Sequence, residues 1–200
     1  RTLQIADRAG GLVESDLILN LNEPNALGDV SWVKPAKYLG VWWSMHLDNE
    51  SWASGPKHAA TTAKTKKVID FAAAHGFRGV LVEGWNPGWD GNWVGNGYDF
   101  DFTRATPDFD IEALSAYGLK KGVHLLGHHE TGCAIEHYED QLSAALDLYA
   151  RLGVDQFKTG YVCDDGQVDR RDPSGGPLWR EWRDGQFMAR HHLKVVQEAA

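Results

Sequence analysis

The feature that most limits the possible folds of this chain is a strand-then-helix pattern that repeats four times. Near-continuous apolar segments, typical of buried strands, begin near residues 37, 78, 123 and 154. The segments that follow them carry apolar residues every three or four positions, as on one face of an amphipathic helix. The clearest of these helices has four such residues before Gly153: Tyr138, Leu142, Leu146 and Tyr149. The pattern predicts a parallel sheet covered by helices.

Capping and turn residues give the expected bounds of these elements. The four strands are expected at residues 37–43, 78–85, 123–130 and 154–162. Thr62 and Asp110 are expected to cap the first two helices, because their side-chain oxygens can accept hydrogen bonds from the first helical N–H groups. Glycines are expected to end the three helices: Gly76, Gly122 and Gly153. A last helix is expected from near Pro177 to the end of the chain. Its apolar stripe is expected to include Trp182, Met188, Val195 and Val196.

Two architectures contain such a sheet, the doubly wound sheet and the (β/α)8 barrel. No G-x-G-x-x-G or Walker loop follows any of the expected strands, which removes the usual reason for a nucleotide-binding sheet. Polar residues gather instead at the C-terminal ends of the strands: Glu83, His128, Glu130 and Lys158. Barrel enzymes build their active sites at this edge, so the barrel is favoured.

The chain holds too few units for a complete barrel. A barrel has eight strand–helix units in ~250 residues, and this chain supplies roughly the first four. Residues 37–200 are therefore expected to be the first half of a catalytic barrel within a longer enzyme. Residues 1–36 are expected to be a lead-in from a preceding β-domain. Half a barrel by itself would leave two sheet edges open.

Composition excludes several classes of function. The net charge of −8, with no basic stripe, argues against nucleic-acid binding. No apolar run approaches the ~20 residues of a membrane span. The two cysteines, Cys133 and Cys163, lack C-x-x-C or metal-site spacing and are expected to be free or buried thiols. Five of the nine tryptophans lie in or just after two expected strands: Trp42, Trp43, Trp85, Trp89 and Trp93. Indole rings stack on sugar rings, although packing in a core is their commoner use.

The third strand ends in two residues that indicate an active site. Alternation along the strand puts His128 and Glu130 on one side and His129 on the other. If the first two face the mouth of the barrel, His129 faces the helices or the layer beneath. A helix N-cap or a surface charge would also explain Glu130, but a His-x-Glu pair after an apolar strand favours a site. Because the two neighbouring histidines point in opposite directions, they cannot easily bind one ion, and catalytic zinc is not expected.

Glu83 and Lys158 lie at the same edge. Glu83 follows three apolar residues, so its carboxylate needs a partner. Lys158 could pair with Glu83 or with Glu130, hold a sugar hydroxyl, or form a Schiff base if it is buried. Glycoside hydrolysis needs carboxyls on both sides of the scissile bond. Because Glu83 and Glu130 lie on neighbouring strands, on one wall, the proton donor is expected on the other half of the barrel.

Six segments of the chain, in order, resemble glycoside hydrolase family 97, which contains the periplasmic α-glucosidase of bacterial starch-utilisation systems. These segments are LNLNEPN at 19–25, KYLGVWWSMH at 37–46, DFAAAHGFRGVLVEGWN at 70–86, PDFD at 107–110, GHHET at 127–131 and FKTGYV at 157–162. The resemblance implies a (β/α)8 catalytic barrel flanked by two β-domains, an oligosaccharide substrate and a periplasmic location. It also implies a calcium ion, whose ligands would lie mostly outside this segment.

The resemblance also implies roles for individual residues. Glu130 would be a general-base carboxylate that activates water, and Glu83, His128, Lys158 and Trp43 would contact the sugar. The family divides into inverting α-glucosidases and retaining α-galactosidases, and the retaining branch has a nucleophilic aspartate on the fourth strand. Here that strand reads KTGY at 158–161, without a carboxylate, which favours an inverting enzyme that cleaves α-glucosidic bonds of malto-oligosaccharides or related α-glucosides. Three alternatives stay open: a retaining α-galactosidase, a Schiff-base aldolase or lyase that uses Lys158, and a sugar-binding barrel without activity.

Overall fold

The computed structural model describes residues 2–25, 28–159, 167–171, 177–182 and 185–199. Clustering of contacts divides the chain into two units, Arg1–Pro35 and Ala36–Ala200. The first unit contains two short helices, α1 (Ala9–Val13) and α2 (Leu17–Asn20), and none of its described residues forms a strand. Its origin in a preceding β-domain stays a prediction.

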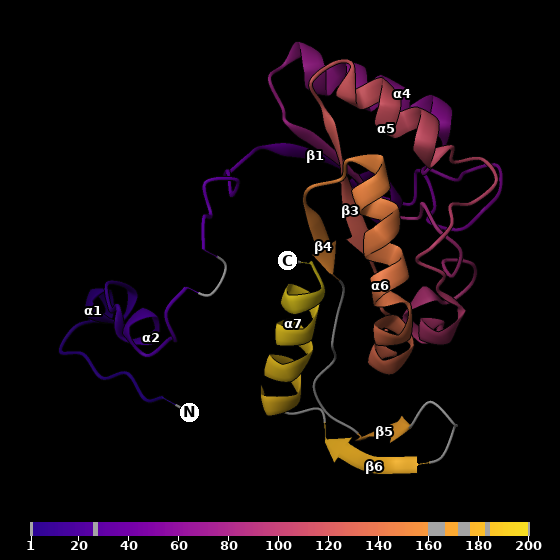
Figure 1. The fold of residues 1–200 in the computed structure, drawn as a ribbon. Coiled ribbons are helices and arrows are strands. Elements are labelled where there is room, and N and C mark those ends of the chain that lie inside the picture. Colours follow the sequence, from indigo (N-terminus) through magenta and orange to yellow (C-terminus); the bar gives the residue numbers. More distant parts are fainter. Residues whose placement is uncertain (1, 26–27, 160–166, 172–176, 183–184, 200) are drawn as a thin grey trace. The chain divides into compact units, whose positions relative to one another are not determined.

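The second unit is built on a parallel sheet, as the sequence predicts, in the order β1-β2-β3-β4. Figure 1 labels β1, β3 and β4 of this sheet. The strands are β1 (Tyr38–Val41), β2 (Gly79–Val82), β3 (His124–His129) and β4 (Phe157–Thr159). Three helices follow the first three strands: α4 (Thr62–Ala74), α5 (Ile111–Leu119) and α6 (Ile135–Leu152). Shorter helical turns lie in the loops: α3 (Trp43–His46), η1 (Trp93–Gly95) and η2 (Gly97–Asp99). The fold is therefore α/β, and the four strands of this sheet run in the same direction.

The helix ends show which capping predictions were correct. Asp110 caps α5, because its carboxylate accepts a hydrogen bond from the backbone N–H of Ala113 at 2.9 Å. Gly153 ends α6 in the left-handed conformation (φ 69°), which glycine adopts without steric cost. The cap of α4 is Thr61 and not Thr62. The Thr62 hydroxyl donates instead to the carbonyl of Asp108, at 2.9 Å, and so joins the start of α4 to the loop before α5.

The main core lies between the strands and the helices. β2 is buried along its whole length, and the apolar face of α6 packs inward through Tyr138, Leu142 and Tyr149. β1 is less buried than expected, since Tyr38 and Gly40 are exposed. Within the described residues β1 pairs with β2 alone, so it is an edge strand with one open side.

The last helix begins later than the sequence predicts. Residues Pro177–Trp182 form a strand, β6, that pairs antiparallel with β5 (Gln167–Arg171), and the helix, α7, spans Gly185–Ala199. Proline is tolerated at the first residue of a strand, so Pro177 marks a strand start here and not a helix start. The predicted stripe is also wrong in part: Trp182 lies in β6, and Val196 is 53% exposed whereas Val195 is buried. None of the helices in the described part of the chain combines the length and the apolarity that a membrane crossing requires.

Candidate active site

The predicted polar residues lie at the C-terminal edge of the sheet, because parallel strands end at the same edge. His128 in β3 is the register partner of Lys158 in β4. Glu83 directly follows β2, and its backbone N–H donates to the carbonyl of Val41 in β1 at 3.2 Å. Glu130 directly follows β3. Three neighbouring strands therefore place four polar side chains along one edge.

The carboxylate of Glu83 lies among three different partners. Its Oε2 accepts a hydrogen bond from the indole Nε1–H of Trp52 at 2.9 Å. Its Oε1 lies 3.6 Å from Nε2 of His128 and 3.9 Å from Nζ of Lys158. Glu83 thus has the partner that its position requires, and it is one of the two carboxylates with which Lys158 was expected to pair. Trp52 was not predicted, since it lies 31 residues earlier, in a loop without strand or helix signals.

His128 is fixed in a buried position beside this carboxylate. Its backbone carbonyl accepts from the indole of Trp85 at 2.8 Å, and its backbone N–H donates to the hydroxyl of Tyr149 at 3.0 Å. Its ring stacks against Trp89, with 5.9 Å between centroids. Burial, with the nearby charge of Lys158, lowers the pKa of His128 to about 3. The ring is therefore neutral at neutral pH, and its contact with Glu83 is not an ion pair.

His129 points to the opposite side, as alternation along β3 predicts. Its ring stacks on Tyr149 at 4.7 Å, and its Nδ1 lies 3.0 Å from the hydroxyl of Tyr138. Both tyrosines belong to α6, so His129 faces the helix layer. The side chain is completely buried, which lowers its pKa to about 3. His129 belongs to the core beneath the site.

Glu130 is buried rather than exposed, with 4% of its surface accessible. One carboxylate oxygen, Oε1, accepts a hydrogen bond from the backbone N–H of Gly132 at 3.1 Å. The cap residue of α6 is Ala134, so Glu130 is not the helix N-cap. Neither of the two structural explanations for this carboxylate, a surface charge or a helix cap, fits its position. A buried carboxylate at the end of a barrel strand is placed as an active-site residue would be.

An aromatic cluster lies beside these side chains and consists of Trp43, His46, Trp52, Trp89 and Trp93. Trp43, one of the four residues predicted to contact the sugar, lies in α3 and is 59% exposed. Its ring is 6.0 Å from that of His46, which is 4.8 Å from Trp52. Trp52 and Trp89 are stacked nearly parallel, at 6.3 Å and 9°. The cluster therefore connects an exposed indole to the buried His128. Trp85, in contrast, belongs to the core.

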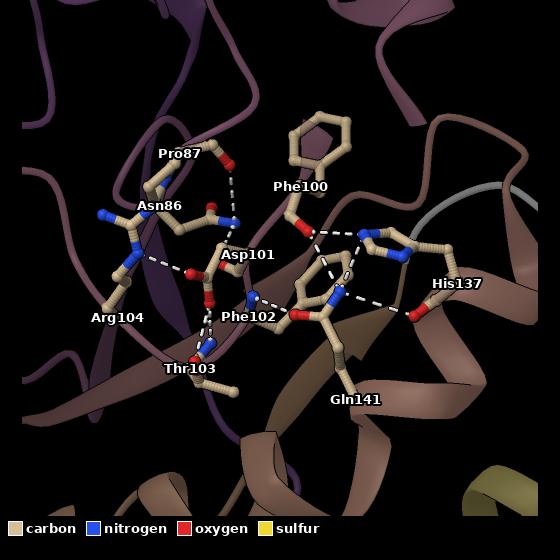
Figure 2. Close-up of polar contacts among 9 residues, drawn as sticks. All are labelled: Asn86, Pro87, Phe100, Asp101, Phe102, Thr103, Arg104, His137 and Gln141. Carbon is tan, nitrogen blue, oxygen red and sulfur yellow. Dashed lines mark hydrogen bonds and ion pairs between the residues drawn. The ribbon is translucent and has the colours of Figure 1, made fainter. Parts of the chain in front are cut away.

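The loop that carries Trp89 and Trp93 is held against α6 by polar contacts (Figure 2). The carbonyl of Phe100 accepts from the amide of Gln141 at 3.0 Å and lies 2.9 Å from Nε2 of His137. The backbone N–H of Phe102 donates to Oε1 of Gln141 at 3.0 Å. Farther along, the side-chain amide of Asn86 donates to the carbonyl of Asp101 at 3.0 Å. These contacts fix the loop, and with it the indole of Trp89, whose Nε1–H donates to Asn86.

Two further expectations concern cysteines and metals. Cys133, three residues after Glu130, is disulfide-bonded, so the expectation of free thiols is wrong for this residue. The other cysteine, Cys163, lies outside the described residues. Within the described part of the chain, no three histidine, cysteine or acidic side chains cluster closely enough to hold a metal ion.

The family model for glycoside hydrolase 97 matches residues 42–200. The chain belongs to glycoside hydrolase family 97. Its fold matches that of a Glycoside Hydrolase Family 97 enzyme from Pseudoalteromonas sp. strain K8, solved in complex with acarbose, with a TM-score of 0.89 and 54% sequence identity. A variant of that enzyme, solved in complex with panose, matches equally well. The four strand–helix units are thus part of a (β/α)8 barrel.

A more distant relative is the retaining α-galactosidase of Bacteroides thetaiotaomicron, which is 27% identical over 160 residues, or 78% of this chain. The structural match covers 97% of this chain. The chain spans 29% of the length of the solved relatives and 21% of the length of the galactosidase. Family and fold are therefore shown for this part of the barrel.

Proposed function

We propose that this chain is part of a glycosidase that hydrolyses α-glucosidic bonds of malto-oligosaccharides or related α-glucosides, with Glu130 as a general base. The observation that carries the proposal is the buried carboxylate of Glu130, which lies beyond β3 next to the edge that holds Glu83, His128 and Lys158. The relatives with 54% identity were solved with acarbose and with panose, an oligosaccharide of α-linked glucose. This favours α-glucosides over α-galactosides as substrates.

The chemistry of the site follows from what each side chain can do. A general base accepts a proton from the water that attacks the anomeric carbon. The N–H of Gly132 holds one oxygen of Glu130 and so orients the carboxylate. His128 is neutral and offers its Nε2, on the side of Glu83, to a sugar hydroxyl, but with a pKa of about 3 it cannot be the acid at neutral pH. Glu83 and Lys158 supply an acceptor and a donor for hydroxyls.

Replacing the proposed base tests this function. In a complete enzyme, in which this chain is joined to the rest of the barrel, Glu130→Gln should lower kcat for p-nitrophenyl α-glucoside by about 10²- to 10⁴-fold, the usual contribution of a general base. KM should change little, because the amide keeps the shape of the carboxylate and the sugar contacts remain. Near-normal turnover in this variant would refute the role of Glu130. No cleavage by the unmodified enzyme would refute the proposed function itself.

Inversion is the proposed stereochemical course, although the galactosidase relative is a retaining enzyme. The support is that β4 and the two residues after it read FKTGY, without the carboxylate that a covalent intermediate requires. NMR of the first sugar released from an α-glucoside should therefore detect the β-anomer. Initial release of the α-anomer would contradict inversion and favour the retaining mechanism.

The proposed location is the periplasm. The disulfide of Cys133 supports an oxidising compartment, since disulfides persist there and are rare in the cytosol. The family resemblance also suggests a calcium ion. Within the described residues, no three histidine, cysteine or acidic side chains cluster closely enough to hold such an ion, and its ligands are proposed to lie mostly outside this segment.

A Schiff-base mechanism at Lys158 has less support. Lysines that form Schiff bases are usually activated by burial, which favours the neutral amine. The side chain of Lys158 is 58% exposed and lies 3.9 Å from the carboxylate of Glu83. This position suits a lysine that donates hydrogen bonds as an ammonium group.

A further inference from the structure

The loop between α3 and α4 contains a residue that reaches the proposed sugar-binding carboxylate. Trp52 is half-buried in this loop, and its indole N–H donates to Oε2 of Glu83 at 2.9 Å. The other oxygen, Oε1, is then the one nearest to His128 and Lys158, at 3.6 and 3.9 Å. Because an indole has a donor and no acceptor, this contact distinguishes the two oxygens of Glu83.

The backbone of Trp52 is held in place by its own loop. The N–H of Ser51 donates to the carbonyl of Lys57 at 2.9 Å, and the N–H of Ala59 donates to the carbonyl of Ser51 at 3.0 Å. The N–H of Ser54 donates to the carboxylate of Asp90 at 2.8 Å. Ser51, before Trp52, is thus held within the loop, and Ser54, after it, is held by Asp90 in another loop. The indole is presented to Glu83 by an ordered backbone.

The same loop also fixes Gly84, the residue that follows Glu83. One ring nitrogen of His58 lies 3.0 Å from the carbonyl of Gly84, and the other lies 2.8 Å from the carboxylate of Asp108. Gly84 has a φ of 81°, and a Cβ at this position would lie 3.1 Å from the carbonyl oxygen of Trp52. The loop therefore packs closely against the end of β2. Glu83 is held through its side chain by Trp52, and the residue after it, Gly84, is held through its carbonyl by His58.

The indole of Trp52 has a second contact that leads toward the site. It stacks on Trp89 at 6.3 Å, and Trp89 stacks in turn on His128 at 5.9 Å. Trp52 thus contacts Glu83 through the N–H at the edge of its ring. The face of its ring packs against Trp89, which packs in turn against His128. Among the described side chains, Trp52 alone makes a hydrogen bond of normal length to the carboxylate of Glu83. The distances from this carboxylate to His128 and Lys158 both exceed 3.5 Å.

We propose that Trp52 is a positioning residue, which orients the carboxylate of Glu83 so that Oε1 and the ammonium of Lys158 together receive one hydroxyl of the sugar. This inference rests on the proposed function, because it assigns Glu83 and Lys158 to the sugar. Trp52 itself acts through Glu83. Its indole N–H donates a hydrogen bond to Oε2 of Glu83, so that Oε1 is the oxygen that contacts the sugar.

A double-mutant cycle in the complete enzyme tests this role. Trp52→Phe keeps an aromatic ring but removes the N–H, and should lower kcat/KM for p-nitrophenyl α-glucoside by about 10- to 100-fold, as expected for a hydrogen bond to a charged group. In a Glu83→Ala background the same substitution should change kcat/KM by less than about threefold, because no carboxylate remains to be oriented. An equal loss in both backgrounds would overturn the proposal.

Trp85 provides the matched control. Its indole N–H also donates near the site, but to the backbone carbonyl of His128. The effect of Trp85→Phe should therefore be the same with and without Glu83. Trp52→His keeps a ring N–H and should retain at least about threefold more activity than Trp52→Phe; equal activity would also overturn the proposal. If Trp52→Phe does not fold by circular dichroism, Trp52→Leu, which also lacks the N–H, takes its place in the cycle. An unmodified enzyme that does not cleave the substrate rejects the proposed function instead.

Discussion

Two adjacent histidines show how far the local environment decides the role of a residue. His128 and His129 are both buried, and burial lowers the pKa of each to about 3. His128 faces Glu83 and Trp89, whereas His129 lies among the aromatic rings of Phe102, Tyr138 and Tyr149. The alternation of side chains along a strand predicts this division. The strong burial of both residues is a consequence of packing that a single sequence does not reveal.

The burial of these histidines predicts an acid sensitivity of the fold. Between about pH 6.5 and pH 3 the unfolded chain protonates both rings, whereas the folded chain keeps them neutral. The unfolded state then binds more protons, so the free energy of unfolding falls as the pH falls, by ~1.4 kcal/mol per pH unit for each histidine. His129→Phe, which keeps a ring in the core, should reduce this slope by ~1.4 kcal/mol per pH unit. Urea unfolding of the complete enzyme between pH 4.5 and 6.5 measures the slope, and an unchanged slope would contradict the pKa of His129.

At the scale of elements, local signals were sufficient where they agreed with the packing. The stripe of α6, the Asp110 cap and the parallel sheet were all predicted from residues close together in the sequence. The strand Pro177–Trp182 was missed because its partner, Gln167–Arg171, is too polar to signal a strand. The exposure of β1 follows from its edge position, which depends on strand order and not on its own apolar residues.

The residues of the candidate site also divide into those that the sequence predicts and one that it does not. Glu83, His128, Glu130 and Lys158 were found because each follows or ends an apolar strand, and parallel strands end at one edge. Trp52 was missed because its contact with Glu83 joins residues 31 positions apart through a loop without regular structure. A loop residue of this kind is placed by hydrogen bonds such as those of Ser51 and Ala59, which only the folded backbone shows.

At the scale of the whole molecule, the four-strand sheet is an incomplete unit. Within the described residues, β1 and β4 are the two outer strands of the order β1-β2-β3-β4. Each presents a row of backbone N–H and C=O groups to one open side. A closed barrel has no such edges, because its first and last strands pair. The relatives that contain this fold are more than three times as long as the chain, which covers 29% of their length.

The open edges predict how the isolated chain behaves. Residues 1–200, expressed alone, should associate through β1 and β4 and elute well above the 22.2 kDa of a monomer, because unpaired strand edges join those of other chains. The same residues within a complete barrel should show no such association, since both edges are then paired. Size-exclusion chromatography with light scattering measures the mass, and thermal melting measures the cooperativity of unfolding. A monomer of the isolated chain that melts in one cooperative transition would mean that the four-strand sheet is stable without the remaining strands.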